Sequence, residues 1–287
     1  MNRRVFLSVA GVGAALLAGC AGTPTEPTDG GAQSPTQEST PTATMRGPRA
    51  GDDLPADETP GDGYPPAFGA TPAARSIDTA SFRTVSRDGQ EVPLAPVETA
   101  YYWYARGEAR FADARGQGQY ERSHVYGAVS SPANNTMSDD PLEGWPEDDR
   151  IVCYCGCPHH LSSIRAADLL NRGYTEVYVI EEGFWETEQH GKGWVPHDYP
   201  VAGANVASHP ASHVIEGRVD DRFAGETAWA RHVASDQVEA TEIESDGRFA
   251  LHLYFSGVGL DEAVTVETPA YRVTAPLGDL TSDVVTA

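Results

Sequence analysis

The sequence predicts an α/β domain with a parallel sheet flanked by helices, followed by a small all-β sandwich. An apolar run at residues 151–154, a helical pattern at 161–171 and a second apolar run at 176–180 have the spacing of a β-α-β unit. After Gly203 the chain changes to short alternating runs divided by turns. Residues 21–75 hold almost no large apolar residue, which is typical of a disordered tether.

The first twenty residues have the features of an export signal. Arg3 and Arg4 precede an apolar stretch shorter than a membrane span, and small residues follow it. The paired arginines are typical of a twin-arginine signal, and the sequence Leu-Ala-Gly-Cys at 17–20 resembles a lipoprotein cleavage box. We therefore expect residues 1–20 to be a lipoprotein signal in which Cys20 carries the lipid. The protein is then exported and anchored to the cell membrane, facing the outside.

The α/β domain is expected to span residues 76–205. It begins with two short strands on either side of the turn Asp88-Gly89. An aromatic-rich stretch from Val97 to Arg106 predicts a helix, and residues 109–114 predict a buried strand. The β-α-β unit follows.

The all-β sandwich is expected to span residues 210–287. Five or six short strands without a helical pattern predict two packed antiparallel sheets. The clearest runs lie at residues 213–219, 227–232, 238–244, 248–255 and 263–267. The region has no cysteine, and its histidines lack the spacing of metal ligands, so we expect a structural or binding module.

The charge is strongly acidic. The 287 residues include 42 Asp and Glu against 20 Lys and Arg, for a formal net charge of −22. Nucleic acid is therefore excluded as a partner, because its phosphates need clustered cations. Lys192 is the only lysine. This composition is typical of salt-loving archaea, whose acidic surfaces work in strongly screening salt.

One block of sequence follows the strand at 109–114. It reads Asp113-Ala-Arg115, then Tyr120, then His124-Val-Tyr-Gly-Ala128. The order is thus a strand that ends in Asp-x-Arg and a following Tyr-x-x-x-His segment that leads to Gly-Ala.

A second block places Cys155 at the end of an apolar run, followed by a six-residue loop and a helix. After the next strand comes Gly183-Phe-Trp185. Together the two blocks resemble the rhodanese-like domain family over about residues 97–203. The resemblance implies the rhodanese fold, with Cys155 as the active-site cysteine.

Sulfur transfer through Cys155 is the function that the resemblance implies. A cysteine before a helix N-terminus meets backbone N–H groups and the positive end of the helix dipole, which favour a thiolate or a persulfide. Cys155 would take sulfur from thiosulfate, a polysulfide or a persulfide and pass it to a thiol acceptor, with no cofactor required. The loop that would bind the donor anion comprises Gly156, Cys157, His159, His160 and Leu161.

This loop departs from the family. His160 stands where Arg is usual, and Leu161 stands where Ser is common. Pro158 removes one backbone N–H from the anion cradle. Thiosulfate specificity is therefore left open, whereas persulfide chemistry is retained.

Two other functions stay open at this point. Five soft or borderline donors within eight residues suit Zn²⁺ or copper, or a thiol-redox pair. They are Cys153, Cys155, Cys157, His159 and His160. Strand alternation places Cys153 and Cys155 on one face, while the loop turns away after Cys155. The third function is a non-catalytic binding protein with the rhodanese fold.

Three residues of the first block are expected to be structural or to line the pocket. The resemblance implies that Asp113 is a structural carboxylate that holds the active-site loop. Arg115 is expected either at the pocket mouth or in an exposed local ion pair. For His124, packing and hydrogen bonding are expected rather than catalysis.

Overall fold

The computed structural model describes residues 62–65, 70–133, 140–156, 159–185, 191–204 and 209–286. The predicted signal with Cys20, most of the predicted tether and Cys157 lie outside these residues. All described residues belong to one compact unit, Met45–Ala287. Within this part of the chain no helix is long and apolar enough to cross a membrane.

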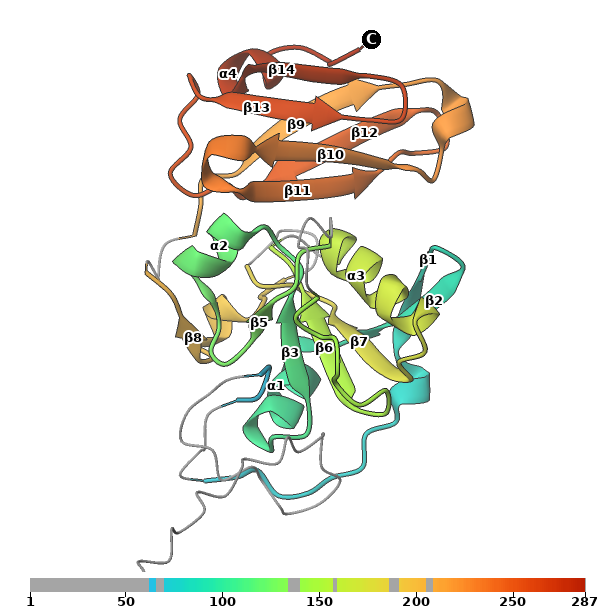
Figure 1. The fold of residues 1–287 in the computed structure, drawn as a ribbon, viewed down its shortest axis with the longest axis vertical. Helices are drawn as coiled ribbons and strands as arrows, with labels where there is room; N and C mark the ends of the chain where they lie inside the picture. Colours follow the sequence, from blue (N-terminus) through green and yellow to red (C-terminus); the bar gives the residue numbers. More distant parts are fainter. Residues whose placement is uncertain are drawn as a thin grey trace, which may run out of the picture. The chain divides into compact units, whose positions relative to one another are not determined.

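A six-stranded mixed sheet forms the α/β part (Figure 1). Its strand order is β1 (Arg83–Arg87), β2 (Gln90–Ala95), β7 (Glu176–Ile180), β6 (Arg150–Tyr154), β3 (Arg110–Asp113) and β5 (Val129–Ser130). Strands β1 and β2 are antiparallel, and the other neighbours are parallel. The sequence predicted the parallel part. The hairpin makes the sheet mixed, because Asp88 and Gly89 both adopt positive φ and form a tight turn.

Two helices cover opposite faces of this sheet. Helix α1 (Val97–Ala105) packs in one hydrophobic cluster with Phe111, Val152 and Tyr178. Helix α3 (His160–Asn171) packs in a second cluster with Ile151 and Val177. Neighbouring residues of β6 therefore point to opposite sides, as expected for a strand buried on both faces. Both helices and the central strands agree with the sequence prediction.

The carboxyl ends of the parallel strands place the two sequence blocks side by side. In the register of β3 and β6, Asp113 is the partner of Tyr154. The N–H of Ala114 donates to the carbonyl of Tyr154 at 2.9 Å. Arg115 and Cys155 follow at the same edge, where ligand sites of parallel sheets form.

The sequence patterns missed several short elements. These are α2 (Gln117–Arg122), β4 (His124–Val125), β8 (Val201–Ala202) and four 3-10 turns at Thr79–Ser81, Val195–His197, Asp221–Phe223 and Val233–Ser235. Strands β4 and β8 pair with each other. Elements this short have too few residues for a periodic pattern, and tertiary contacts determine them.

Six strands after residue 209 form two antiparallel sheets. The larger sheet contains β11 (Gln237–Glu242), β10 (Thr227–His232), β13 (Ala263–Glu267) and β14 (Arg272–Pro276), and the smaller contains β12 (Arg248–Leu253) and β9 (His213–Arg218). Side chains from both sheets share one core, including Leu251 and Val264. This is the two-sheet arrangement that the sequence predicts. Strand β14 and the short helix α4 (Leu277–Leu280) were not predicted.

Residues 62–65 differ from the tether expected over 21–75. The Nη1 of Arg110 and the indole nitrogen of Trp145 each donate to the carboxylate of Asp62 at 2.8 Å. The guanidinium of Arg110 also stacks over the ring of Tyr64 at 4.3 Å. This short segment therefore belongs to the folded α/β part, because it supplies partners for a fully buried arginine.

Candidate functional site

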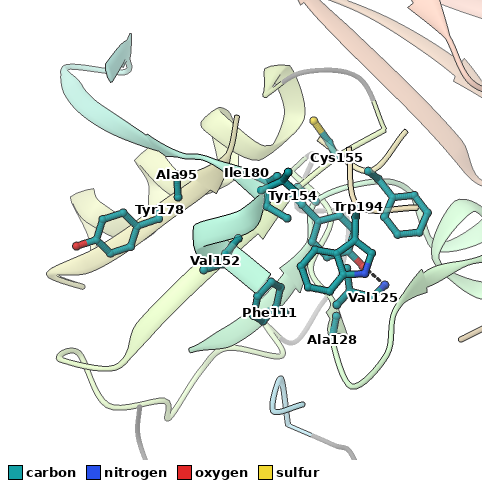
Figure 2. Close-up of a cluster of buried hydrophobic side chains, with 14 of the residues drawn as sticks. Ala95, Phe111, Val125, Ala128, Val152, Tyr154, Cys155, Tyr178, Ile180 and Trp194 are labelled. Carbon is teal, nitrogen blue, oxygen red and sulfur yellow. Dashed lines mark hydrogen bonds between the residues drawn. The ribbon is translucent and has the colours of Figure 1, made fainter. Parts of the chain in front are cut away.

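Cys155 lies directly after β6, at the carboxyl edge of the sheet. Its side chain is fully buried and belongs to the same cluster as Tyr154 and Trp194 (Figure 2). The Sγ atom is 3.3 Å from the hydroxyl oxygen of Ser162. The backbone carbonyl of Cys155 accepts a hydrogen bond from the N–H of Phe184 at 2.9 Å. A strand end, a helix start and a hydroxyl thus converge on this sulfur.

Cys153 does not share this environment. It lies in the second cluster, under α3, whereas Cys155 lies in the first. The expectation that the two share one face is wrong, because β6 ends at Tyr154 and alternation does not extend to Cys155. Burial raises the pKa of the Cys153 thiol to about 12. Cys153 is therefore a small apolar core residue.

Helix α3 begins at His160, five residues after Cys155 along the chain. His159 precedes the helix in the left-handed conformation, with φ 46° and ψ 11°. Its carbonyl accepts from the N–H of Ser163 at 3.0 Å, which closes the first turn. His160 is half-buried, and the side chain of Leu161 is buried in the same cluster as Cys155. The side chain of Leu161 is therefore part of the apolar surroundings of Cys155.

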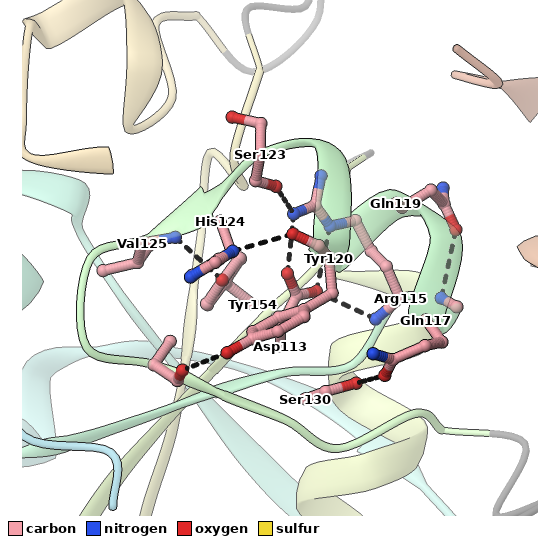
Figure 3. A network of polar contacts seen from close by, with 12 residues as sticks. Asp113, Arg115, Gln117, Gln119, Tyr120, Ser123, His124, Val125, Ser130 and Tyr154 are labelled. Carbon is pink, nitrogen blue, oxygen red and sulfur yellow. Dashed lines mark hydrogen bonds and ion pairs between the residues drawn. The ribbon is translucent and has the colours of Figure 1, made fainter. Parts of the chain in front are cut away.

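Asp113, at the end of β3, and Arg115 form a buried ion pair (Figure 3). Arg115 Nε and Nη2 donate to the two carboxylate oxygens at 2.9 and 2.6 Å. Nη2 also donates to the carbonyl of Ser123 at 2.6 Å. Burial alone would lower the pKa of Arg115, but the adjacent Asp113 carboxylate outweighs it and raises that pKa.

The stem of Arg115 lies next to Gly156, the residue after Cys155, because a Cβ at Gly156 would be 3.6 Å from Arg115 Cδ. Arg115 is only 2% exposed, so the expectation of an exposed local ion pair is wrong. Its guanidinium stacks over Phe184 at 4.3 Å. A charge so enclosed is stable only with matched partners, which Asp113 supplies. Asp113 binds the side chain and the backbone N–H of Arg115, and that it holds the active-site loop stays a prediction.

His124 is a packing residue. Its ring stacks on Tyr120, with 3.9 Å between ring centroids, and Nδ1 donates to the carbonyl of the same residue at 2.7 Å. Burial lowers the pKa of His124 below its usual 6.5, which favours the neutral ring. The hydroxyl of Tyr154 accepts the next backbone N–H, from Val125, at 3.0 Å.

Two residues near the site could not be found from local sequence. Glu239 of β11 is fully buried, and its Oε1 would lie 3.3 Å from a Cβ built on Gly156. Gln119 of α2 donates to the same Oε1 at 2.9 Å. The other amide atom, Oε1 of Gln119, accepts from the N–H groups of Gly116 and Val238. The C-terminal sheets therefore contribute a carboxylate next to the residue after Cys155.

No group of three or more His, Cys, Asp and Glu side chains suited to a metal occurs among the described residues. Cys153 and Cys155 lie in different clusters, and Cys157 is outside the described residues. The described residues therefore do not support the Zn or Cu site that was predicted from five donors.

Comparison with known proteins identifies one domain. Residues 98–190 match the family described as the rhodanese-like domain. The search among proteins of curated function finds no match.

Several solved structures resemble part of the chain. The NMR structure of the rhodanese-like domain of an Anabaena sp. protein has 18% identity and a TM-score of 0.34, covering 42% of this chain and 85% of that one. A Bacillus halodurans protein has 20% identity and a TM-score of 0.33, covering 39% and 77%. A rhodanese with anions from E. coli has 22% identity and a TM-score of 0.25, covering 33% and 96%. Residues 98–190 of this chain are a rhodanese-like domain.

Proposed function

We propose that the protein carries and transfers sulfur as a persulfide on Cys155. The observation that carries this proposal is the position of Cys155, between the end of the central strand β6 and the start of α3, within the rhodanese-like domain. The hydroxyl of Ser162, 3.3 Å from Sγ, is placed to donate to a thiolate. The helix dipole favours the same charge.

The chemical step needs no cofactor. The Cys155 thiolate attacks the outer sulfur of a donor, the donor's own sulfur bond breaks, and a sulfur–sulfur bond to Cys155 forms. With thiosulfate, sulfite leaves; with a persulfide RS–SH, the thiolate RS⁻ leaves. A thiol acceptor reverses the step when it attacks the outer sulfur of the Cys155 persulfide. No net oxidation occurs.

The test is an assay for cyanide-labile sulfur. The reduced protein is incubated with a persulfide or thiosulfate in high salt, desalted and treated with cyanide, and thiocyanate is measured. We expect about one labile sulfur per chain in the wild type and in Cys153→Ala, and none in Cys155→Ser. Absence of labile sulfur in the wild type, or its persistence in Cys155→Ser, would contradict the proposal.

Non-catalytic binding is a second candidate, and one observation favours it. Cys155 is fully buried, and its cluster includes Val238 and Ala240 of β11 and Tyr254, which follows β12. If no sulfur donor can reach the Cys155 sulfur, this side chain contributes only to packing. Folded wild-type protein that neither gains labile sulfur nor reacts with iodoacetamide at Cys155 would support this candidate.

We also propose the location that the N-terminal sequence predicts. Export is supported by the paired arginines Arg3 and Arg4. Lipid attachment on the outer face of the cell membrane is supported by the lipoprotein box that ends at Cys20. Intact mass spectrometry of the protein purified from membranes is expected to show a chain beginning at a lipidated Cys20. A Cys20→Ser variant is expected to be released from the membrane.

A further inference from the structure

A pocket of about 220 Å³ lies beside α1, among residues that the proposed sulfur transfer does not use. Its walls come from the segment before β1, from α1 and from the start of β6, and they include Arg75, Tyr102, Trp103 and Arg150. Arg150 begins β6, whereas Cys155 follows the end of the same strand. Because a strand rises about 3.3 Å per residue, roughly 16 Å separates the two residues. The pocket is therefore at the opposite edge of the sheet from Cys155.

Two guanidinium groups of this pocket are stacked on aromatic rings of α1. The guanidinium of Arg75 lies over the ring of Tyr102, 4.4 Å from its centroid. That of Arg150 lies over the ring of Trp103 at 4.7 Å. A ring that contacts the face of a guanidinium leaves its N–H edge available for hydrogen bonds in the plane. Tyr102 and Trp103 are consecutive and buried, so α1 holds both arginines beside the pocket.

The backbone of Arg75 is bound to the same helix. Its N–H donates to the hydroxyl of Tyr102 at 2.7 Å, and that hydroxyl donates to the carbonyl of Arg75 at 3.3 Å. The residue itself is exposed. Among the described residues, no carboxylate forms an ion pair with its guanidinium. Arg75 is thus a cation that is held in place and has hydrogen-bond donors to spare.

Arg150 also has donors that its neighbours do not satisfy. Its Nε is buried and has no hydrogen-bond partner. Its Nη1 is 3.9 Å from Glu108 Oε2, and its Nη2 is 3.6 Å from Glu176 Oε2. Both distances exceed the roughly 2.7–2.9 Å of a strong hydrogen bond between a guanidinium and a carboxylate. A buried donor without an acceptor is costly, so an acceptor supplied by a ligand would stabilise this arrangement.

The carboxylates near Arg150 have other partners. Glu108, which also lines the pocket, accepts from Nε of Arg106, a third arginine of the lining. Glu176 accepts from the hydroxyl of Tyr178 at 3.0 Å. Neither carboxylate therefore depends on Arg150 for a hydrogen-bond donor, and Arg150 can bind a further acceptor without breaking these contacts.

We propose that this pocket binds a small oxyanion through Arg75 and Arg150. Guanidinium groups form paired N–H···O bonds with carboxylates and phosphates, a geometry that chloride cannot match. A volume of about 220 Å³ is below the ~300–1,000 Å³ of pockets for drug-sized ligands, which restricts the occupant to an inorganic oxyanion or a short carboxylate. The formal net charge of −22 disfavours anions over the surface as a whole, so binding requires this local pair of arginines. It does not depend on the proposed persulfide function.

The experiment is isothermal titration calorimetry of the full chain with sodium phosphate and, separately, with sodium succinate. Concentrated sodium chloride is present throughout to screen non-specific attraction. We expect saturable binding of at least one probe, with one site per chain and a Kd of about 1 mM or lower. The two arms distinguish a tetrahedral oxyanion from a carboxylate.

Variants of the two arginines locate the site. Arg75→Gln is expected to fold normally, because the residue is exposed, and to weaken binding by about tenfold or more through the loss of charge-assisted hydrogen bonds. The same loss is expected for Arg150→Gln. The matched control is Arg83→Gln, the same change at an exposed arginine that binds Glu181 outside this pocket. Its affinity is expected to equal that of the wild type, as is the affinity of Cys155→Ser.

Two outcomes would overturn the proposal. One is the absence of saturable binding of both probes in the wild type. The other is an unchanged affinity in Arg75→Gln and Arg150→Gln, since the anion would then bind elsewhere, for instance near Cys155. Circular dichroism shows which variants are folded, and Arg75→Gln decides the case if Arg150→Gln does not fold.

Discussion

Arg115 and Asp113, two residues apart at the end of β3, bind one another through paired hydrogen bonds of 2.9 and 2.6 Å in a site closed to water. The same arginine stacks on Phe184 and lies beside Gly156. The pair is therefore part of the wall against which the Cys155 loop packs.

Breaking this pair is expected to destabilise the protein strongly. Arg115→Met leaves the Asp113 carboxylate buried without its cation, at a cost of about 3–5 kcal/mol in the free energy of unfolding. Chemical denaturation checks this value. The control is Arg83→Met, which removes an exposed ion pair with Glu181 and should cost about 1 kcal/mol or less. Equal losses in the two variants would contradict the structural role of Arg115.

Cys153 is expected to be inert. With its thiol pKa raised to about 12 by burial, roughly one molecule in 10,000 carries the thiolate at pH 8. Iodoacetamide should leave Cys153 unmodified in the folded protein and modify it after denaturation, as peptide mapping can show. Modification of Cys153 in native protein at the rate of a free thiol would contradict its place in the core.

His124 is expected to make stability depend on pH. Burial depresses its pKa in the folded protein below 6.5, so the unfolded chain takes up the proton first. The His124 contribution to stability is therefore complete above the unfolded pKa of 6.5 and is lost as pH falls toward the folded pKa. Urea unfolding from pH 7.5 to 5.5 should show a steeper loss for the wild type than for His124→Gln. Parallel pH profiles would refute this assignment.

Asp62 is expected to stabilise the α/β part although it lies in a Pro- and Gly-rich segment. Asp62→Ala removes hydrogen bonds to Arg110 and Trp145, and the expected loss is about 1–3 kcal/mol. Thermal and urea unfolding measure it. Glu143→Ala, at an exposed site, should change stability by about 0.5 kcal/mol or less. If both variants behave alike, residues 62–65 contribute nothing to the fold.

Local periodicity was sufficient to predict the framework of the site. The run at 176–180 coincides with β7, and the helix predicted from Leu161 begins one residue earlier, at His160. These elements are long enough for their buried faces to recur regularly in the sequence. The position of Cys155 followed from them, because it lies where a predicted strand ends.

The other features of the site could not be predicted from the sequence, because they depend on long-range contacts and on where strands end. Gln119 and Glu239 meet across 120 residues of chain, and neither lies in a motif. The separation of Cys153 from Cys155 depends on the strand ending at Tyr154, and periodicity does not fix such boundaries. Likewise, the exposure of Arg115 is set by Asp113 and Phe184 in the folded chain.

The amide of Gln119 has a practical consequence for anyone who divides this chain. A fragment that ends at Gly203 would match the rhodanese-like region, yet it would lose two of the three hydrogen-bond partners of Gln119 and expose the apolar side chains that Val238 and Ala240 cover. In such a fragment the cluster that contains Cys155 would lack Val238, Ala240 and Tyr254, and Gly156 would lack Glu239 as a neighbour. The reactivity of Cys155 in this fragment would therefore not represent its reactivity in the intact protein.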